Sequence, residues 1–153
     1  KQHLQKTMSE INQAHPDVCA VISVNKGLVT QASAAIPVVP LYFAILYKVM
    51  KKAGNHENCI QQIARLFTQK LYTPEGFRTD ENGFIRMDDY ELTPEIQEEV
   101  KKCWKAVTTD TVKEYCDIDG YWEDFYHMFG FRYEDIDYTQ DVDADIEIDG
   151  VVM

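Results

Sequence analysis

The stretch Val18-Cys-Ala-Val-Ile-Ser-Val-Asn-Lys-Gly-Leu-Val-Thr-Gln-Ala-Ser33 decides the fold, because it predicts a strand followed by a loop. Residues 18–24 form an almost unbroken apolar run that is rich in β-branched side chains. A strand that is apolar on both faces is typical of a parallel sheet covered by helices on both sides. One strand cannot satisfy its own backbone. We find no second strand of equal quality, so we expect its neighbours to lie outside this chain.

Residues 25–33 follow this strand at its carboxyl end, which is where open α/β sheets bind ligands. Gly27 permits close approach of the backbone, and Thr30 and Ser33 offer hydroxyls to a cofactor amide or a substrate carbonyl. An ordinary strand-to-helix turn uses the same residue types. The spacing alone therefore leaves a binding loop and a plain turn both open.

The rest of the chain is predicted to be mainly helical. Periodicity predicts helices over residues 1–15, 41–53 and 56–72, and further helices that begin at Thr93-Pro94 and at Asp119. The connection over residues 73–92 is rich in turns, with room for a short hairpin. We expect these side chains on the inward faces of the last three helices: Ile60, Ile63, Ala64, Phe67 and Leu71; Ile96, Val100, Cys103, Trp104 and Val107; Trp122, Phe125, Met128 and Phe129.

Composition and charge exclude several classes of protein. The chain has 153 residues, 45% of them apolar, and a formal charge of −11. Residues 134–149 contain eight acids and no lysine or arginine, so the body is nearly neutral and lacks the basic face that nucleic acid requires. The longest apolar run, residues 32–47, is broken by Pro37 and Pro40 and is too short to span a bilayer. Without a signal peptide, this predicts a cytoplasmic protein.

Cysteine and histidine spacing favours no metal site and no redox pair. The four cysteines lie 40, 44 and 13 residues apart, and three fall on predicted apolar faces. We therefore expect buried free thiols in a reducing compartment. The acidic segment from Asp141 lacks the glycine at position six and the glutamate at position twelve of a calcium loop. A solvated tail is the simpler interpretation.

The segment Ser23-Val-Asn-Lys-Gly-Leu-Val-Thr-Gln-Ala-Ser-Ala-Ala-Ile-Pro-Val-Val-Pro-Leu-Tyr42 resembles the trans-2-enoyl-CoA reductases and the related single-chain enoyl-acyl-carrier-protein reductases of bacteria. The likeness continues over essentially the whole chain, through Gly54-Asn-His-Glu57, Arg86-Met-Asp-Asp-Tyr-Glu-Leu92 and Phe129-Gly-Phe131. The resemblance implies an NADH-dependent enzyme that reduces the double bond of a trans-2-enoyl thioester in fatty acid synthesis.

The same resemblance implies an α/β fold, with this chain as the C-terminal part of a Rossmann-type reductase related to short-chain dehydrogenases. The chain itself would be mostly α-helical with one buried parallel-type strand. Residues 1–35 would end the Rossmann core, residues 36–133 would form the helical region around the acyl pocket, and residues 134–153 would be an acidic tail.

Site residues follow from the family pattern, in which a tyrosine precedes a lysine by eight intervening residues. The tyrosine stabilises the enolate oxygen, and the lysine holds the cofactor ribose and lowers the pKa of the tyrosine. By register the lysine is Lys1, and the tyrosine would lie nine positions earlier. The resemblance also assigns Leu28, Val29 and Thr30 to the nicotinamide side of NADH, and Val39, Tyr47 and Tyr121 to the acyl pocket. Tyr47 and Tyr121 also suit a plain helical core.

The family's C-terminal region is sometimes labelled flavin-binding, but we expect NADH and no flavin. No G-x-G-x-x-G loop occurs in the 153 residues, so the phosphate site is expected upstream. Preference for NADH over NADPH is inherited from the resemblance.

Two classes of function remain. The chain is either the C-terminal part of an enoyl-CoA or enoyl-acyl-carrier-protein reductase, inactive without its N-terminal half, or a non-catalytic helical interaction module with an acidic tail. Complementation by a separately made N-terminal chain is a variant of the first. Because a lone parallel-type strand exposes its edges, we expect the isolated chain to form a homo-oligomer or to be poorly stable.

Overall fold

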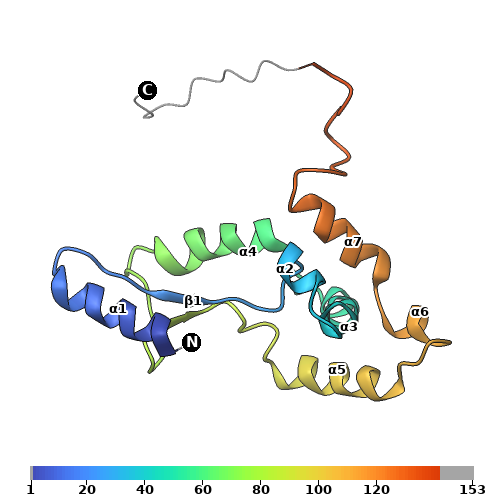
Figure 1. The fold of residues 1–153 in the computed structure, drawn as a ribbon, viewed down its shortest axis with the longest axis horizontal. Coiled ribbons are helices and arrows are strands. Elements are labelled where there is room, and N and C mark those ends of the chain that lie inside the picture. The colour runs from blue at the N-terminus through green and yellow to red at the C-terminus, as the bar shows by residue number, and fades with distance from the viewer. Residues whose placement is uncertain (1, 142–153) are drawn as a thin grey trace.

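A computed structural model describes residues 2–141 of the chain. Helices dominate these residues, as the sequence predicts, and two short strands accompany them (Figure 1). In chain order the elements are α1 (Gln2–Ala14), β1 (Ile22–Val24), α2 (Gln31–Ala34), α3 (Val39–Ala53), α4 (Cys59–Arg65), the π-helix η1 (Leu66–Leu71), β2 (Phe84–Arg86), α5 (Pro94–Ala106), α6 (Val112–Tyr115) and α7 (Ile118–His127).

The strand pair is parallel, which confirms the predicted type of β1. Ile22 pairs with Phe84 and Val24 with Arg86, and the Met87 N–H extends the pairing to the Val24 carbonyl at 2.9 Å. Two expectations were wrong. We expected the neighbours of β1 outside this chain, but β2 of the same chain pairs with it. Residues 73–92 contain this parallel strand in place of a hairpin. A three-residue strand is too short to show an alternating pattern, and Asn82-Gly83 imitates a hairpin turn.

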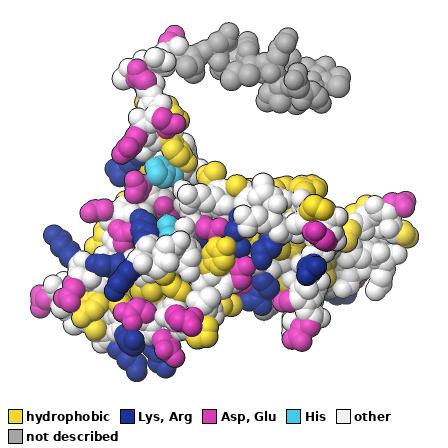
Figure 2. Space-filling model, turned by 180° about the vertical axis from the view of Figure 1, so that it is seen from behind, with side chains coloured by type: hydrophobic (Ala, Val, Ile, Leu, Met, Phe, Trp, Pro, Cys, Tyr) yellow, Lys and Arg dark blue, Asp and Glu magenta, His cyan; other side chains and the backbone are white. Residues whose placement is uncertain are grey.

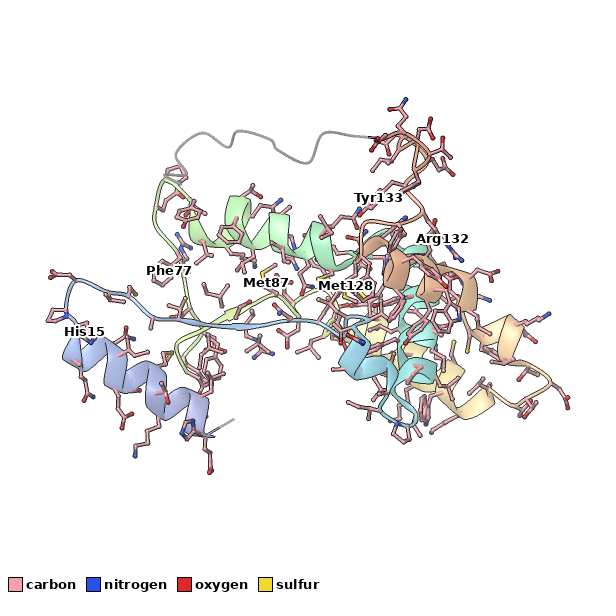
Figure 3. All side chains as sticks on the ribbon, turned by 45° about the horizontal axis from the view of Figure 1, so that its top comes forward. His15, Phe77, Met87, Met128, Arg132 and Tyr133 are labelled. Carbon is pink, nitrogen blue, oxygen red and sulfur yellow. The ribbon has the colours of Figure 1, made fainter. Side chains whose placement is uncertain are left out.

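β1 itself is shorter and more exposed than predicted. It covers three residues of the apolar run, all of them only partly buried, and Val18 is 51% exposed. Between the sheet and α4, Met87 is fully buried (Figure 3). One side of the small sheet is therefore covered by residues of this chain.

The hydrophobic core is built around α3, which Figure 1 shows end-on between α5 and α7. Seven of its side chains are buried, because the helix is apolar nearly all round. Gly54 ends the helix with a φ of 74°, as predicted for that position. Ile96 and Val100 of α5 and Tyr121 of α7 pack against it.

The orientation of α4 and η1 was predicted wrongly. Ile60, Ile63 and Phe67 are 45–51% exposed, whereas Gln62 and Arg65 are buried. Hydrophobic side chains appear in yellow along the upper edge of the molecule in Figure 2. The polar face turns inward because Arg65 pairs there with the partly buried acids Glu57 and Asp89, described below.

Three further expectations about burial were wrong. Trp104, Trp122 and Phe129 are 40–48% exposed, and α7 buries Tyr121 and Asp124 instead. The carboxylate of Asp117 accepts from the Gly120 N–H at 3.0 Å and pairs with Lys51 at 2.8 Å, which fixes the rotation of α7.

Of the four cysteines, Cys116 alone is buried, and Cys19 is exposed because the strand begins after it. All four are free thiols. Within residues 2–141, no helix has the length and hydropathy that a membrane span requires.

Candidate functional site

The loop over residues 25–30 lies directly against α3. The Val29 N–H donates to the hydroxyl oxygen of Tyr47 at 2.7 Å, and both residues are buried. At Gly27 a Cβ atom would lie 2.6 Å from Cε1 of Phe43, so only glycine lets the backbone pass. The close approach predicted for Gly27 is therefore made to α3.

A carboxylate from the segment that follows β2 holds the same loop. Glu91 Oε2 accepts from the Gly27 N–H at 2.5 Å, and its Oε1 accepts from the Tyr42 hydroxyl at 2.7 Å. Glu91 is buried, with 8% of its surface exposed. Burial, together with the bond to Glu91, raises the pKa of Tyr42 to about 12.

Thr30 and Ser33 form a capping box at the start of α2. Thr30 Oγ1 accepts from the Ser33 N–H, and Ser33 Oγ accepts from the Thr30 N–H at 2.8 Å and also bonds the Leu28 carbonyl. These hydroxyls, predicted to offer hydrogen bonds to a ligand, thus first satisfy the turn. Among residues 2–141, by contrast, no hydrogen bond engages the Leu28 N–H or the Val29 carbonyl.

Lys26 of the loop belongs to a buried charged cluster. Lys26 is 3% exposed, and its Nζ lies 4.9 Å from the centre of the Tyr47 ring. Burial lowers the pKa of Lys26 to about 8, although Asp124 and Glu91 act in the opposite direction. His56 Nε2 lies 2.9 Å from Asp124 Oδ2, and the His56 ring meets the Tyr47 ring edge-on.

Arg65 fixes the segment that carries Glu91. Its guanidinium pairs with Glu57 at 2.6 Å and with Asp89 at 3.0 Å, and it donates to the Met87 carbonyl at 3.0 Å. It also lies 4.2 Å from the centre of the Tyr90 ring. Sequence reasoning missed these charged residues because no local pattern distinguishes a buried acid from a solvated one.

The predicted acyl-side residues are only partly brought together. Tyr121 lines an apolar cleft of about 210 Å³ between α3 and α7, together with Pro40, the neighbour of Val39. The buried Tyr121 hydroxyl has no hydrogen-bond partner among the described residues. Tyr47 is fully buried two turns further along α3 and does not line this cleft.

Two predictions fall on residues that are not described. Lys1 lies outside the described residues, as does the segment 142–153 of the acidic tail. Residues 134–141 of that tail are exposed. Over the body, acidic and basic side chains are mixed on the face shown in Figure 2.

Comparison with known proteins gives two matching families. Residues 1–72 match the family described as trans-2-enoyl-CoA reductase catalytic region, and residues 79–142 match the family described as enoyl reductase FAD binding domain. An enoyl-acyl-carrier-protein reductase (NADH) of Flavobacterium psychrophilum is 45% identical over 99% of this chain and 39% of its own length. A trans-2-enoyl-CoA reductase (NADH) of Ruminiclostridium cellulolyticum is 45% identical over 99% of the chain and 38% of its own length.

Solved structures agree with these matches. A Treponema denticola trans-2-enoyl-CoA reductase in complex with NAD is 46% identical, with a TM-score of 0.82 over 92% of this chain and 36% of the other. The Clostridium acetobutulicum trans-2-enoyl-CoA reductase in complex with NADH is 45% identical. Its TM-score is 0.81 over 93% of this chain and 36% of the other. The chain thus spans less than two fifths of the length of the relatives it matches.

The flavin in one family description does not fit the segment that follows β2. A flavin dinucleotide needs backbone N–H groups or free cations around its pyrophosphate. In this segment β2 is followed by the acids Asp88, Asp89 and Glu91, and the Arg86 guanidinium is already bound by Asp88. The solved relatives are in complex with NAD or NADH.

Family matches over residues 1–72 and 79–142, 45–46% identity and closely similar solved structures agree with the resemblance found in the sequence. The chain belongs to the family of NADH-dependent trans-2-enoyl-CoA and enoyl-acyl-carrier-protein reductases, whose C-terminal part it matches.

Proposed function

We propose that this chain is the C-terminal part of a cytoplasmic reductase that uses NADH to convert a trans-2-enoyl thioester into the saturated acyl thioester of fatty acid synthesis. The observation that carries the proposal is the loop over residues 25–30. It follows a parallel strand, is held against α3 by Tyr47 and Glu91, and leaves the Leu28 N–H and the Val29 carbonyl without partners among residues 2–141.

These two backbone groups suit the nicotinamide ring. A carboxamide has one acceptor and two donors, so an N–H group and a carbonyl on one loop can bind it from both sides. Leu28, Val29 and Thr30 would orient the ring, with Thr30 acting through the capping box that shapes the loop. Bound NADH supplies the hydride, and the protein supplies orientation and electrostatics.

The proton chemistry would need Lys1 and a tyrosine upstream of it. Hydride addition at the β-carbon of the enoyl thioester places negative charge on the thioester oxygen, and a proton then completes the product at the α-carbon. A tyrosine nine positions before Lys1 would donate to that oxygen, and the ammonium group of Lys1 would hold the ribose and favour the tyrosinate. On this account the chain alone is inactive.

The acyl chain would lie near the N-terminal turn of α3. Val39 is partly buried there, and Tyr121 faces the apolar cleft beside Pro40, with its hydroxyl buried and without a partner among the described residues. Tyr47 is fully buried. We therefore assign it an indirect part, through the loop that its hydroxyl holds.

The proposed partner is the N-terminal half of the same enzyme. The apolar stripe of α1 is open, with Leu4 57% and Ile11 36% exposed, and α4 with η1 presents Ile60, Ile63 and Phe67 outward. Exposed apolar side chains that share a helix face are typical of a surface that another part of the protein covers. The relatives are roughly 395 residues long, because 154 matched residues are 39% of one of them.

The test is NADH oxidation, followed at 340 nm, with trans-2-enoyl-CoA and with enoyl-acyl-carrier protein as substrates. The polypeptide that continues upstream of Lys1 should oxidise NADH with one of them, and the 153-residue chain should not. A separately made upstream half should restore activity if the two parts associate. Inactivity of the continuous polypeptide with both thioesters would favour the non-catalytic interaction module.

A further inference from the structure

We propose that Glu91 is a positioning residue for the nicotinamide end of NADH, acting through the loop over residues 25–30. The inference rests on the proposed function of that loop and adds a residue that lies 61 positions beyond Thr30 in the sequence. Glu91 does not contact the cofactor on this account. It sets the place of the backbone groups that do.

Both oxygens of the Glu91 carboxylate are used. Oε2 accepts from the Gly27 N–H at 2.5 Å, and Oε1 accepts from the Tyr42 hydroxyl at 2.7 Å. Gly27 belongs to the loop and Tyr42 to α3, so one carboxylate joins two elements. Hydrogen bonds to an ionised acceptor are stronger and shorter than neutral ones, and burial strengthens them further.

Glu91 is itself held in place. Its carbonyl accepts from Gln97 Nε2 of α5 at 2.8 Å. The preceding residues are fixed by Arg65, which donates to the Met87 carbonyl and pairs with Asp89. Because Glu91 is held in place in this way, its carboxylate can define where the loop lies.

The place at which Glu91 binds the loop gives its hydrogen bond a functional consequence. The Gly27 N–H is bound by Glu91 and the Val29 N–H by Tyr47, so the two anchors lie on either side of Leu28. The Leu28 N–H and the Val29 carbonyl, which we propose face the carboxamide, lie between or beside these anchors. Without Glu91, the hydrogen bond to Tyr47 would be the one of these two anchors that remains.

The two ends of the cofactor provide the test, because ADP-ribose has the adenosine and phosphates of NADH but no nicotinamide. The continuous polypeptide that extends upstream of Lys1 would be titrated with both ligands by calorimetry. The Glu91→Ala variant should bind NADH about tenfold or more weakly and should bind ADP-ribose within about twofold of wild type. The exposed Glu98→Gln variant is the matched control and should bind both ligands like wild type.

The Glu91→Gln variant provides a conservative rescue. Its amide oxygen can still accept from the Gly27 N–H, and its amide N–H can donate to the Tyr42 oxygen. NADH affinity should return to within about threefold of wild type. If Glu91→Ala does not fold, Glu91→Asp replaces it, because the side chain shorter by one methylene keeps the charge but cannot span both partners.

Four results would overturn the inference. Equal weakening of NADH and ADP-ribose would show a general structural role, and unchanged NADH affinity in Glu91→Ala would show no role. Wild type that binds ADP-ribose but neither binds NADH nor reduces an enoyl thioester would refute the proposed function, and this inference with it. Normal wild-type turnover with an unaffected Glu91→Ala variant would refute this inference alone.

Discussion

The hydroxyl oxygen of Tyr47 accepts a hydrogen bond from the Val29 N–H across 2.7 Å, which joins the centre of α3 to the loop that follows β1. Tyr47 is fully buried, and Val29 is 2% exposed. Through this hydrogen bond a residue of the hydrophobic core holds the loop that we propose contacts the cofactor. It is also the relationship from which the first prediction follows.

Replacing Tyr47 by phenylalanine should destabilise the protein by about 1–3 kcal/mol, because the Val29 N–H would remain buried without an acceptor. Urea unfolding measures this change in the free energy of unfolding. The Tyr72→Phe variant is the matched control, since Tyr72 is 77% exposed, and it should differ from wild type by less than about 0.5 kcal/mol. Equal stability of Tyr47→Phe and wild type would contradict the assigned bond.

Gly27→Ala should cost about 1–3 kcal/mol, because the new Cβ would lie 2.6 Å from the Phe43 ring and 3.3 Å from Leu46. Thermal and urea unfolding would both measure the loss. Combining Gly27→Ala with Phe43→Leu removes the ring that clashes, so the two costs should not add. Additive costs would show that the clash with Phe43 is not the cause.

Lys26 should make stability depend on pH in the alkaline range. Its pKa is lowered by burial to about 8, against 10.5 for the exposed side chain. Between these two pH values the unfolded chain binds more protons than the folded one, so this group makes the protein more stable as pH rises from about 8 towards 10.5. Below pH 8 the cost of the buried charge is fully present.

The Lys26→Met variant isolates that contribution. We compare the free energy of unfolding of the variant with that of wild type at each pH. The variant's value minus the wild-type value should be about 3 kcal/mol higher at pH 7 than at pH 10.5. Comparing the two proteins at each pH cancels the opposing contribution of Tyr42, whose pKa is raised to about 12. A difference that stays constant from pH 7 to 10.5 would show that Lys26 titrates normally.

The exposed apolar face of α4 and η1 should control the solution behaviour of the isolated chain. We expect wild-type chain to self-associate or to be poorly stable, and Ile63→Lys with Phe67→Lys to reduce self-association in light scattering. In the continuous polypeptide the same changes should lower the thermal midpoint, because they would be buried against the upstream half. Ile60 stays unchanged in both proteins.

A lysine at an exposed position outside this face supplies the comparison. Glu98→Lys on α5 adds charge on an exposed site and should leave both proteins unaffected. A monodisperse, stable wild-type monomer of the 153-residue chain would count against an uncovered interface.

The sequence predicted those parts of the fold whose signal is local. The all-round apolar pattern of α3, its end at Gly54, and the parallel character of β1 are properties of short segments, and the structure confirms them. The predicted rotations of α4 and α7 about their axes were wrong, because ion-pair partners far away in the sequence decide which face turns inward. Arg65 turns inward to reach Glu57 and Asp89, and Asp124 turns inward to reach His56.

The candidate site shows the same division. The loop after β1 was predicted from its place at the end of a strand, and Gly27 was recognised as a point of close approach. Glu91 was not recognised, because its two partners lie 64 and 49 residues away and no spacing rule connects them. β2 escaped prediction because three residues carry too little periodicity.

The most direct test of the account is made on the native protein. An extract of the source cells would be fractionated by size, peptides of this chain would be followed by mass spectrometry, and NADH-dependent reduction of enoyl thioesters would be assayed in the same fractions. We predict that both signals coincide at a mass well above 17.7 kDa, by at least a further domain of roughly 100–200 residues. Peptides of the chain found only near 17.7 kDa, in fractions without activity, would contradict it.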